Sequence, residues 1–495
     1  MANLLVVSNP RDWPLQLRGV QIVSAKQYLT DPTFSRAGKV RVVNLCRSYS
    51  YQSMGYYVSL MAAARGHKPQ PDVARMQDLK SATLVQAMAE QLDPLIQKTL
   101  RRVAGEQFEL SIYFGRTLAQ RDGQLGKRLF GLFGAPLMRA TFLKKRSKWK
   151  LSRLRAIPAS EIPPAHNVDL VAAVGQYFAN PRWSGTAARG MRYWMAILVD
   201  PEEKTPPSNE AFLERLIRTG RKYDLAAETI TPDQIGRLGE YDALFIRATT
   251  STNDYTYRFS RKAWAEGLAV IDDPVSIARC TNKVYLAELL GLHGVPAPKT
   301  VIVHRDNIDQ ALAELSLPCV LKQPDSSFSL GVVKAETAEQ FRQQTARFLA
   351  GSDLLVAQQY LPTDFDWRIG LLDGRALYAC RYYMARSHWQ IVRHGDDGKM
   401  HEGRADTVEI DQVPPGVIEA ARRAAALIGD GLYGVDIKEI DGLARVIEVN
   451  DNPSLDSGVE DAVLHGRLYE AIIESFIRRI ERIRQAGRSL VPPPV

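Results

Sequence analysis

Between residues 191 and 274, apolar and polar positions alternate with two different periods, which predicts strands and helices in turn. The segments 194–199 and 242–247 are almost continuously apolar, as buried strands are. Between them, residues 211–217 repeat their apolar positions at helical spacing, and Gly220 supplies a stop. This part of the chain therefore predicts a small α/β domain.

Residues 1–155 contain a second series of strand-like segments. They lie at positions 4–8, 20–24, 40–45 and 108–114. The segment 157–164 holds three prolines and is interpreted as an extended linker, because the residue before a proline is disfavoured in a helix. At 495 residues the chain is too long for one hydrophobic core, so we expect two or three domains.

Two strand-like segments near the C-terminus, 434–438 and 446–450, carry oxygen-bearing side chains at matching positions. Because side chains alternate along a strand, Glu448 and Asn450 point to one side, where Asp436 on a neighbouring antiparallel strand can meet them. Two carboxylates and an amide oxygen suit Mg²⁺, which takes its other ligands from water and substrate phosphates. The alternative is that Asp436 and Glu448 are ordinary polar positions on an exposed strand face.

Two lysines upstream stand where phosphate ligands are needed. Lys283 begins a predicted helix with Thr281 as its cap, and Lys322 ends the apolar strand 319–322. A turn-like segment rich in small residues, 323–331, follows, and such a loop can offer backbone N–H groups to a triphosphate. No GxxxxGK[ST] motif is present, so a P-loop enzyme is not indicated.

In their order and spacing, these parts resemble an ATP-grasp ligase. More narrowly, the chain resembles the RimK-like and glutathione-synthetase-like carboxylate–amine ligases, from about Met191 to the C-terminal helix. The resemblance implies a mixed α/β (α+β) fold, in which an ATP-grasp domain follows a small α/β domain. The basic N-terminal α/β domain is similar to the accessory domain found ahead of some RimK-like ligases. The implied domains are the accessory domain at 1–165, the pre-grasp domain at 190–280, the lid at 281–355 and the catalytic subdomain at 356–485.

The resemblance also implies which residues bind ATP. Lys283 and Lys322 correspond to the lysines that contact the nucleotide phosphates, where a compact ammonium offsets the polyphosphate charge. Asp366 corresponds to a carboxylate that accepts from the ribose hydroxyls. Four residues correspond to the hinge whose backbone pairs with the adenine edge: Gln358, Gln359, Tyr360 and Leu361. The family often has Glu at position 359, and the Gln359 amide keeps an acceptor for the adenine amino group.

The remaining implied roles concern phosphate transfer. Arg381 corresponds to an arginine near the γ-phosphate and the acyl-phosphate oxygens, and Arg368 can reach phosphate or substrate. Asp436, Glu448 and Asn450 correspond to the ligands of Mg²⁺, with Mn²⁺ as an alternative.

Three features leave alternatives open. The loop 326–331 has one glycine where the family's lid loop is usually glycine-rich, and serine hydroxyls would replace some backbone contacts to phosphate. Lys438 shares a strand face with Asp436, and we favour a salt bridge to Glu448 over an extra phosphate contact. Arg247 ends the strand 242–247 and either grips a substrate carboxylate or pairs locally.

Basic residues are concentrated in the N-terminal third. Residues 1–155 hold 26 Lys and Arg against 9 Asp and Glu, a net charge of +17, whereas residues 156–495 hold 38 against 46, a net charge of −8. Such a domain could bind RNA, an acidic protein or an acidic substrate. The alternative is a solvated surface, or one that faces the acidic C-terminal part.

Other features predict a cytoplasmic protein without a membrane partner. No apolar run approaches the length of a membrane span, and the N-terminus lacks a basic n-region and a long apolar h-region. The four cysteines show no CxxC spacing, which argues against a disulfide framework or a zinc site. A homo-oligomer is left open.

The resemblance implies an ATP-dependent carboxylate–amine ligase acting on an amino acid or small peptide. A substrate carboxylate would attack the γ-phosphate, and an amine would capture the acyl phosphate under a lid that excludes water. The products would be an amide or peptide bond, ADP and phosphate. The alternatives are a ligase that modifies an acidic or RNA-bound protein, and a nucleotide- or RNA-binding regulator without turnover.

Overall fold

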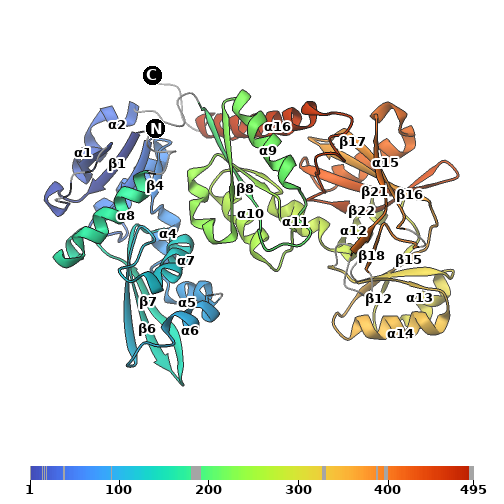
Figure 1. Ribbon diagram of the computed structural model, residues 1–495, viewed down its shortest axis with the longest axis horizontal. Helices are drawn as coiled ribbons and strands as arrows, with labels where there is room; N and C mark the ends of the chain where they lie inside the picture. Colours follow the sequence, from blue (N-terminus) through green and yellow to red (C-terminus); the bar gives the residue numbers. More distant parts are fainter. Residues whose placement is uncertain are drawn as a thin grey trace. The chain divides into compact units, whose positions relative to one another are not determined.

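The computed structural model describes residues 2–13, 15, 17, 19–36, 40–90, 92–179, 191–325, 331–385, 388–394 and 400–489. The chain divides into two compact units, which are described separately. The first unit comprises residues 1–190 and 233–240, and the second comprises residues 191–232 and 241–495. Both contain helices and strands, so the predicted mixed α/β class is confirmed (Figure 1).

A parallel sheet of order β2-β1-β3-β4 forms one half of the first unit. Its central strands are rich in Val and Leu and are buried on both faces, as expected when helices cover both sides of a parallel sheet. Its elements are β1 (Ala2–Val7), β2 (Val20–Ser24), α1 (Ala25–Thr30), α2 (Pro32–Arg36), β3 (Val40–Asn44), α3 (Met54–Ala64), β4 (Lys68–Gln70) and α8 (Asn167–Ala179).

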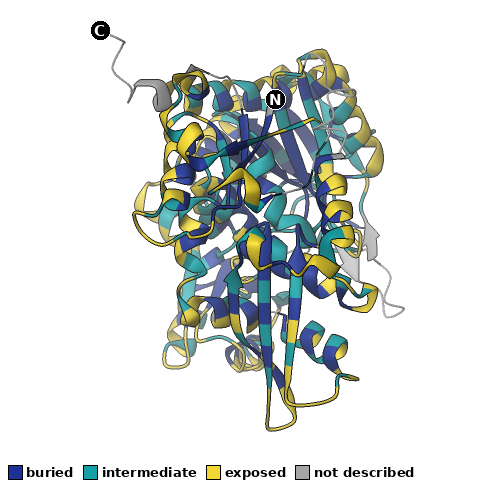
Figure 2. Cartoon of the chain, turned by 90° about the vertical axis from the view of Figure 1, so that its left-hand side faces the viewer, coloured by how far each residue is buried: buried dark blue, intermediate teal, exposed yellow. Residues whose placement is uncertain are grey.

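An antiparallel sheet of order β5-β6-β7 forms the other half of the first unit. Helices cover one of its faces, and the β6–β7 hairpin projects beyond them (Figure 2). The elements are α4 (Val73–Asp78), α5 (Ala82–Glu90), α6 (Asp93–Leu100), β5 (Gln107–Tyr113), α7 (Gly123–Phe133), β6 (Leu137–Lys145) and β7 (Lys148–Ala156).

The segment interpreted as a linker, 157–164, is part of the first unit. Ile157 and Ile162 lie in its core beside Leu170 and Val174 of α8. The prolines do exclude a long helix, since only short 3₁₀ turns form there. The segment is structural because Ile157 and Ile162, each followed directly by a proline, are buried in this core.

The second unit begins with a parallel sheet of order β11-β10-β8-β9. Helix α16 packs on this sheet through Ile472 and Phe476, although it follows the catalytic strands in the sequence. Figure 1 shows α16 beside α9. The elements are β8 (Tyr193–Leu198), α9 (Glu210–Lys222), β9 (Leu225–Ile230), β10 (Ala243–Ile246), α10 (Tyr255–Ala265), β11 (Ala269–Ile271), α11 (Pro274–Cys280) and α16 (Gly466–Ser489).

A small antiparallel sheet of order β12-β15-β13-β14 follows, with two helices packed on it. Its last strand, β15, runs to Gln359, four residues past the predicted lid boundary at 355. The elements are α12 (Lys283–Leu292), β12 (Thr300–Val303), α13 (Ile308–Glu314), β13 (Cys319–Lys322), β14 (Val332–Ala335), α14 (Ala338–Leu349) and β15 (Leu355–Gln359). We refer to this sheet as the lid sheet.

The largest sheet of the second unit is antiparallel, with the order β20-β17-β16-β21-β22. Helix α15 packs on it through a face of small residues that includes Ala421 and Ala424. The elements are β16 (Phe365–Leu372), β17 (Arg375–Tyr383), β18 (Val392–His394), β19 (Met400–Glu402), β20 (Ala405–Val408), α15 (Pro415–Ala426), β21 (Leu432–Ile440) and β22 (Leu443–Asn450). We refer to this sheet as the catalytic sheet.

Two further observations bear on the expectations from composition. None of the helices in the described part of the chain combines the length and apolar character that a membrane crossing needs. All four cysteines belong to the described residues, and each is buried with a free thiol.

Candidate active site

A cavity of about 150 Å³ opens between the lid sheet and the catalytic sheet. It gathers most of the residues predicted to bind nucleotide and metal, although they come from separate parts of the sequence. Its lining includes Lys283, Lys322, Gln358, Gln359, Tyr360, Leu361, Asp366, Asp436, Lys438 and Glu448. The side chains that a nucleotide phosphate and a metal would need therefore converge in one place.

The two acidic strands pair as predicted. In the β21–β22 ladder Asp436 lies directly opposite Glu448, and Gly434 lies opposite Asn450. A bulge follows the Asp436–Glu448 pair and leaves Ile447 as an extra residue. The Asn450 amide nitrogen lies 3.1 Å from Asp436 Oδ2, so the three predicted metal ligands share one face.

Cations flank both carboxylates. Lys283 Nζ lies 2.7 Å from Glu448 Oε1, and Arg368 donates to both oxygens of Asp436 at 2.7 and 2.8 Å. Burial raises the pKa of Glu448, but Lys283 and Lys322 hold that pKa below its ordinary value. Glu448 is therefore available as an anion, and together Glu448, Asp436 and Asn450 fit the oxygen-ligand set that Mg²⁺ prefers.

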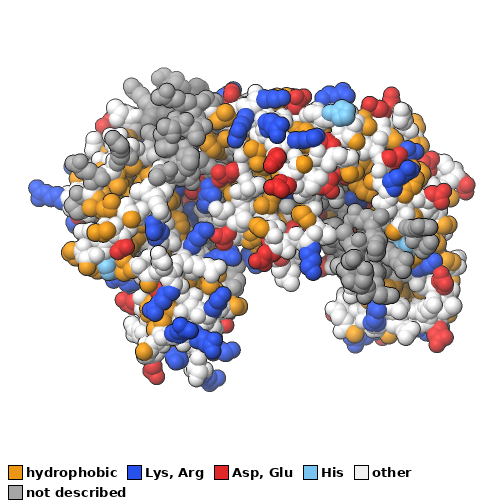
Figure 3. Space-filling view, viewed as in Figure 1, with side chains coloured by type: hydrophobic (Ala, Val, Ile, Leu, Met, Phe, Trp, Pro, Cys, Tyr) orange, Lys and Arg blue, Asp and Glu red, His pale blue; other side chains and the backbone are white. Residues whose placement is uncertain are grey.

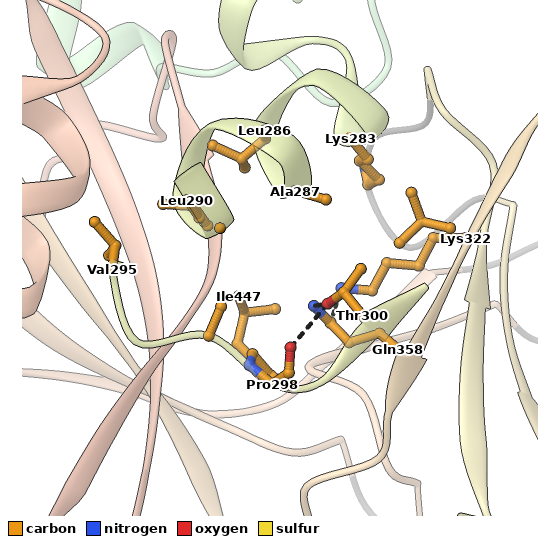
Figure 4. Close-up of a pocket in the computed structure, with 13 residues that line it drawn as sticks. Lys283, Leu286, Ala287, Leu290, Val295, Pro298, Thr300, Lys322, Gln358 and Ile447 are labelled. Atoms are coloured by element: carbon orange, nitrogen blue, oxygen red, sulfur yellow. Dashed lines mark hydrogen bonds between the residues drawn. The ribbon is translucent and has the colours of Figure 1, made fainter. Parts of the chain in front are cut away.

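Lys322 is held by its neighbours on the lid sheet. Its ammonium donates to Gln358 Oε1 at 2.7 Å, and Gln358 Nε2 donates to Thr300 Oγ1 at 3.0 Å. Figure 4 shows this chain of side chains beside a second cavity, of about 210 Å³, that shares Lys283 and Lys322 with the first. The Gln358 side chain thus orients the lysine.

Burial lowers the pKa of Lys322 to about 8, with Glu448 opposing the shift. A bound phosphate would favour the ammonium form and raise that pKa again. ATP binding should therefore take up a proton above pH 8, and its affinity should fall as the pH rises through about 8. Titration calorimetry at about pH 9, in two buffers of different ionisation enthalpy, measures this uptake.

The control for this prediction is Lys322→Arg, which stays charged at that pH and should lose the uptake. Binding of ATP by the unmodified chain with no proton uptake at the same pH would contradict the assignment.

The predicted partner of Lys438 is wrong. Its ammonium lies 2.5 Å from Asp366 Oδ1 and 2.6 Å from Thr363 Oγ1, and Glu448 is paired with Lys283 instead. Lys438 and Asp366 face each other across β21 and β16, which sequence spacing alone did not reveal. Lys438 therefore belongs to the site as the residue that positions Asp366.

The hinge segment after β15 lines the cavity through Tyr360 and Leu361. The backbone N–H of Gln359 donates to Lys299 O at 2.8 Å, and its side chain is exposed. Tyr360 meets Trp389 edge to face, with ring centroids 5.9 Å apart. Apolar lining residues that the sequence analysis missed are Val320, Val332, Trp389, Ile391 and Ile447.

The two predicted catalytic arginines differ in setting. Arg368 is largely buried and held by Asp436, whereas Arg381 is about one-third exposed and pairs with Asp406 at 2.6 Å. Asp406 lies on β20, directly opposite Arg381. Arg381 is the one that has solvent access, although it does not line the cavity described above.

For Arg247, the geometry favours local pairing. This side chain is 1% exposed and donates to Ser208, to Asn452 and to the carbonyl oxygens of Pro207 and Pro453. With its donors occupied in this way, Arg247 ties β10 to the segment after β22 and is not presented to a substrate.

Three further points concern sequence signals. The cap of α12 is Asn282, which accepts from Val284 N and Tyr285 N, and not Thr281 as predicted. The serine-rich part of the loop, 326–330, lies outside the described residues. Residues 429–434 spell GxGxxG, but they connect α15 to β21, whereas a dinucleotide fingerprint runs from a strand into a helix.

Comparisons with known proteins identify the family of this chain. The profile of the RimK-like ATP-grasp domain matches residues 280–465, and that of the RimK-like ATP-grasp N-terminal domain matches residues 25–173. The chain therefore belongs to the RimK-like ATP-grasp ligases, which form C–N bonds at the expense of ATP. The recognition made from the sequence is confirmed.

Curated relatives match up to about half of this chain. A probable alpha-L-glutamate ligase of Psychromonas ingrahamii is 26% identical over 253 residues, which span 50% of this chain and 80% of the relative. A probable alpha-L-glutamate ligase of Thioalkalivibrio sulfidiphilus is 28% identical over 226 residues, which span 45% of this chain and 72% of the relative. Among solved structures, D-alanine–D-alanine ligase of Bacillus anthracis has a TM-score of 0.46 at 16% identity and covers 59% of this chain and 99% of that one.

Proposed function

We propose that this ligase joins a carboxylate to an amine through an acyl phosphate, with an amino acid or a short peptide among its substrates. The observation that carries the proposal is the cavity in which Asp436 and Glu448 lie with Lys283 and Lys322, with Asn450 beside Asp436 on the same strand face. This arrangement sets metal ligands opposite phosphate ligands, as phosphoryl transfer requires.

In this mechanism, Lys283, Lys322 and Arg381 offset the negative charge of the phosphate groups. Lys322, oriented by Gln358, contacts phosphate oxygens, and Lys283 moves from Glu448 to phosphate when ATP binds. Arg381 would leave its pair with Asp406 to stabilise charge on the γ-phosphate and the acyl phosphate. Asp436, Glu448 and Asn450 would hold Mg²⁺, which neutralises phosphate charge when bound, with Mn²⁺ as an alternative. Asp366, fixed by Lys438, accepts from the ribose.

Glutamate is the first amino acid to test, because the curated relatives are named probable alpha-L-glutamate ligases. The assay measures phosphate release from ATP and Mg²⁺ with single amino acids, pairs of amino acids and short peptides, and mass spectrometry identifies the product. We expect release above background with at least one carboxylate–amine pair, together with a product of the summed masses less water.

The control is Arg342→Gln, which removes an exposed cation on α14 that pairs with Asp309 and lies outside the cavity lining. It should leave phosphate release unchanged. Tight ATP binding without release in any combination would favour a regulator without turnover and contradict the proposal.

We also assign the enzyme to a reducing cytoplasm. The four buried thiols support this, since none is paired. Burial raises the pKa of Cys319 to about 11, which keeps that thiol protonated and unreactive.

A further inference from the structure

The β5-β6-β7 sheet of the first unit has two unlike faces. The face toward α5, α6 and α7 is apolar and includes Leu110, Phe142, Leu151 and Leu154. Because side chains alternate along each strand, the intervening residues of the hairpin lie on the opposite face. The apolar cluster around α8 covers one end of that face, at Tyr113 and Leu137. We call the rest of the face, on β6 and β7, the basic face.

The basic face carries a dense set of cations. The outward positions of β6 and β7 are occupied by Arg139, Lys145, Lys148, Lys150, Arg153 and Arg155. Figure 3 shows Lys and Arg gathered over this hairpin, at the lower left of the view. Glu109 lies on the same sheet, and Glu161 pairs with Arg155 at 2.7 Å, so anions are few by comparison.

The register of the hairpin places like charges directly opposite each other. Arg139 is paired with Arg155, and Lys145 is paired with Lys148. Like charges at opposed positions destabilise a sheet. The turn between them, Arg146 and Ser147, has φ values of 49° and 66°, a conformation that favours Gly or Asn. The hairpin is therefore not optimised for its own stability, as expected of a surface that meets an anionic partner.

The chemistry of the basic face distinguishes between two kinds of polyanion. Single-stranded nucleic acids usually stack bases on aromatic rings. Here Trp149 and Phe142 are buried on the apolar face and Tyr113 is buried in the cluster around α8, so the described outward positions of β6 and β7 on the basic face offer no ring. An acidic polypeptide needs no stacking. Its alternate side chains repeat at about 6.8 Å in the extended form, which matches the spacing of Lys148 with Lys150 and of Arg153 with Arg155 along β7.

The geometry also indicates how the partner lies. The free edge of β7 is blocked at Trp149, whose N–H donates to Gln97 Oε1 at 3.0 Å and whose carbonyl accepts from Gln97 Nε2 at 2.6 Å. A peptide cannot extend the sheet at that point. We propose that an extended acidic polypeptide segment docks across the basic face, with its carboxylates on the cations of β6 and β7.

The test measures binding of fluorescein-labelled decaglutamate to the full chain by anisotropy, without ATP, so the result does not depend on the proposed ligase activity. At about 50 mM salt the peptide should bind, and the affinity should fall at least about tenfold at 300 mM salt, because exposed charges are screened beyond the Debye length. Decaglutamine should not bind.

The variant Lys148→Glu/Lys150→Glu should lower the affinity at least about tenfold without lowering Tm, because the carboxylate introduced at position 148 would face Lys145 with opposite charge. The matched control, Lys26→Glu/Lys80→Glu, makes the same charge change at exposed positions of the same unit and should alter affinity less than about twofold.

Three results would overturn the proposal. One is no decaglutamate binding at low salt, and another is equal affinity loss in the variant and its control. The third is that labelled oligouridine of ten nucleotides binds more tightly than the peptide and loses affinity in the same variant. That result would assign the basic face to nucleic acid.

Discussion

Glu448→Gln is expected to lower kcat at least about 100-fold and to leave the protein folded. The neutral amide is a weaker metal ligand, and a 100-fold loss corresponds to about 2.7 kcal/mol of transition-state stabilisation. The change also removes the anion that Lys283 contacts at 2.7 Å. The measurements are kcat over a Mg²⁺ titration and Tm by circular dichroism.

A suitable control is Glu419→Gln, on the exposed side of α15, where the carboxylate lies 3.6 Å from Arg422. It should leave kcat unchanged. If Glu448→Gln keeps the unmodified rate at saturating Mg²⁺, the metal assignment fails.

Lys322→Ala should weaken ATP binding about 10- to 100-fold and should also lower kcat. Hydrogen bonds to charged groups contribute about 1.5–3 kcal/mol, and this ammonium meets phosphate in both the ground state and the transition state. The variant also leaves Gln358 Oε1 without the donor it has at 2.7 Å. Titration calorimetry with ATP measures the affinity.

The comparison variant is Lys262→Ala on α10, a lysine outside the cavity lining that pairs with Glu266. Its ATP affinity should match that of the unmodified chain. An unchanged affinity in Lys322→Ala would remove this lysine from the nucleotide site.

The pairing of the two predicted metal-ligand strands could be predicted because it depends on neighbouring parts of the sequence. Strand alternation and one short hairpin connection set Asp436 opposite Glu448, and the structure has that register. Lys322 was also predictable, since it ends an apolar strand and is followed by a turn. The family resemblance then ordered these parts, and matches at 25–173 and 280–465 confirm it.

The contacts between distant strands were not predictable. Lys438 pairs with Asp366 because β21 lies beside β16, and Arg381 pairs with Asp406 because β20 lies beside β17. Neither neighbour follows from spacing along the chain. The return of α16 to the first sheet of the second unit has the same cause, since tertiary packing of its apolar face decides its position.

The start of α12 and the structure of the segment 157–164 could not be predicted, because the sequence allows two arrangements of similar stability in each case. Asn282 and Thr281 are both good caps, and only backbone geometry selects Asn282, whose side chain accepts two N–H groups. The prolines at 158, 163 and 164 are equally compatible with a linker and with a buried irregular segment. Because Ile157 and Ile162 pack against α8, the segment is a buried irregular segment and not a linker.

Transfer of oxygen-18 tests the central claim most directly. A substrate that supports phosphate release is labelled in its carboxylate with oxygen-18, and the phosphate is analysed by mass spectrometry after a single turnover. An acyl-phosphate ligase predicts one labelled oxygen in each inorganic phosphate, because the carboxylate oxygen bonds to phosphorus and leaves with it. Unlabelled phosphate, or label in AMP, would contradict the account.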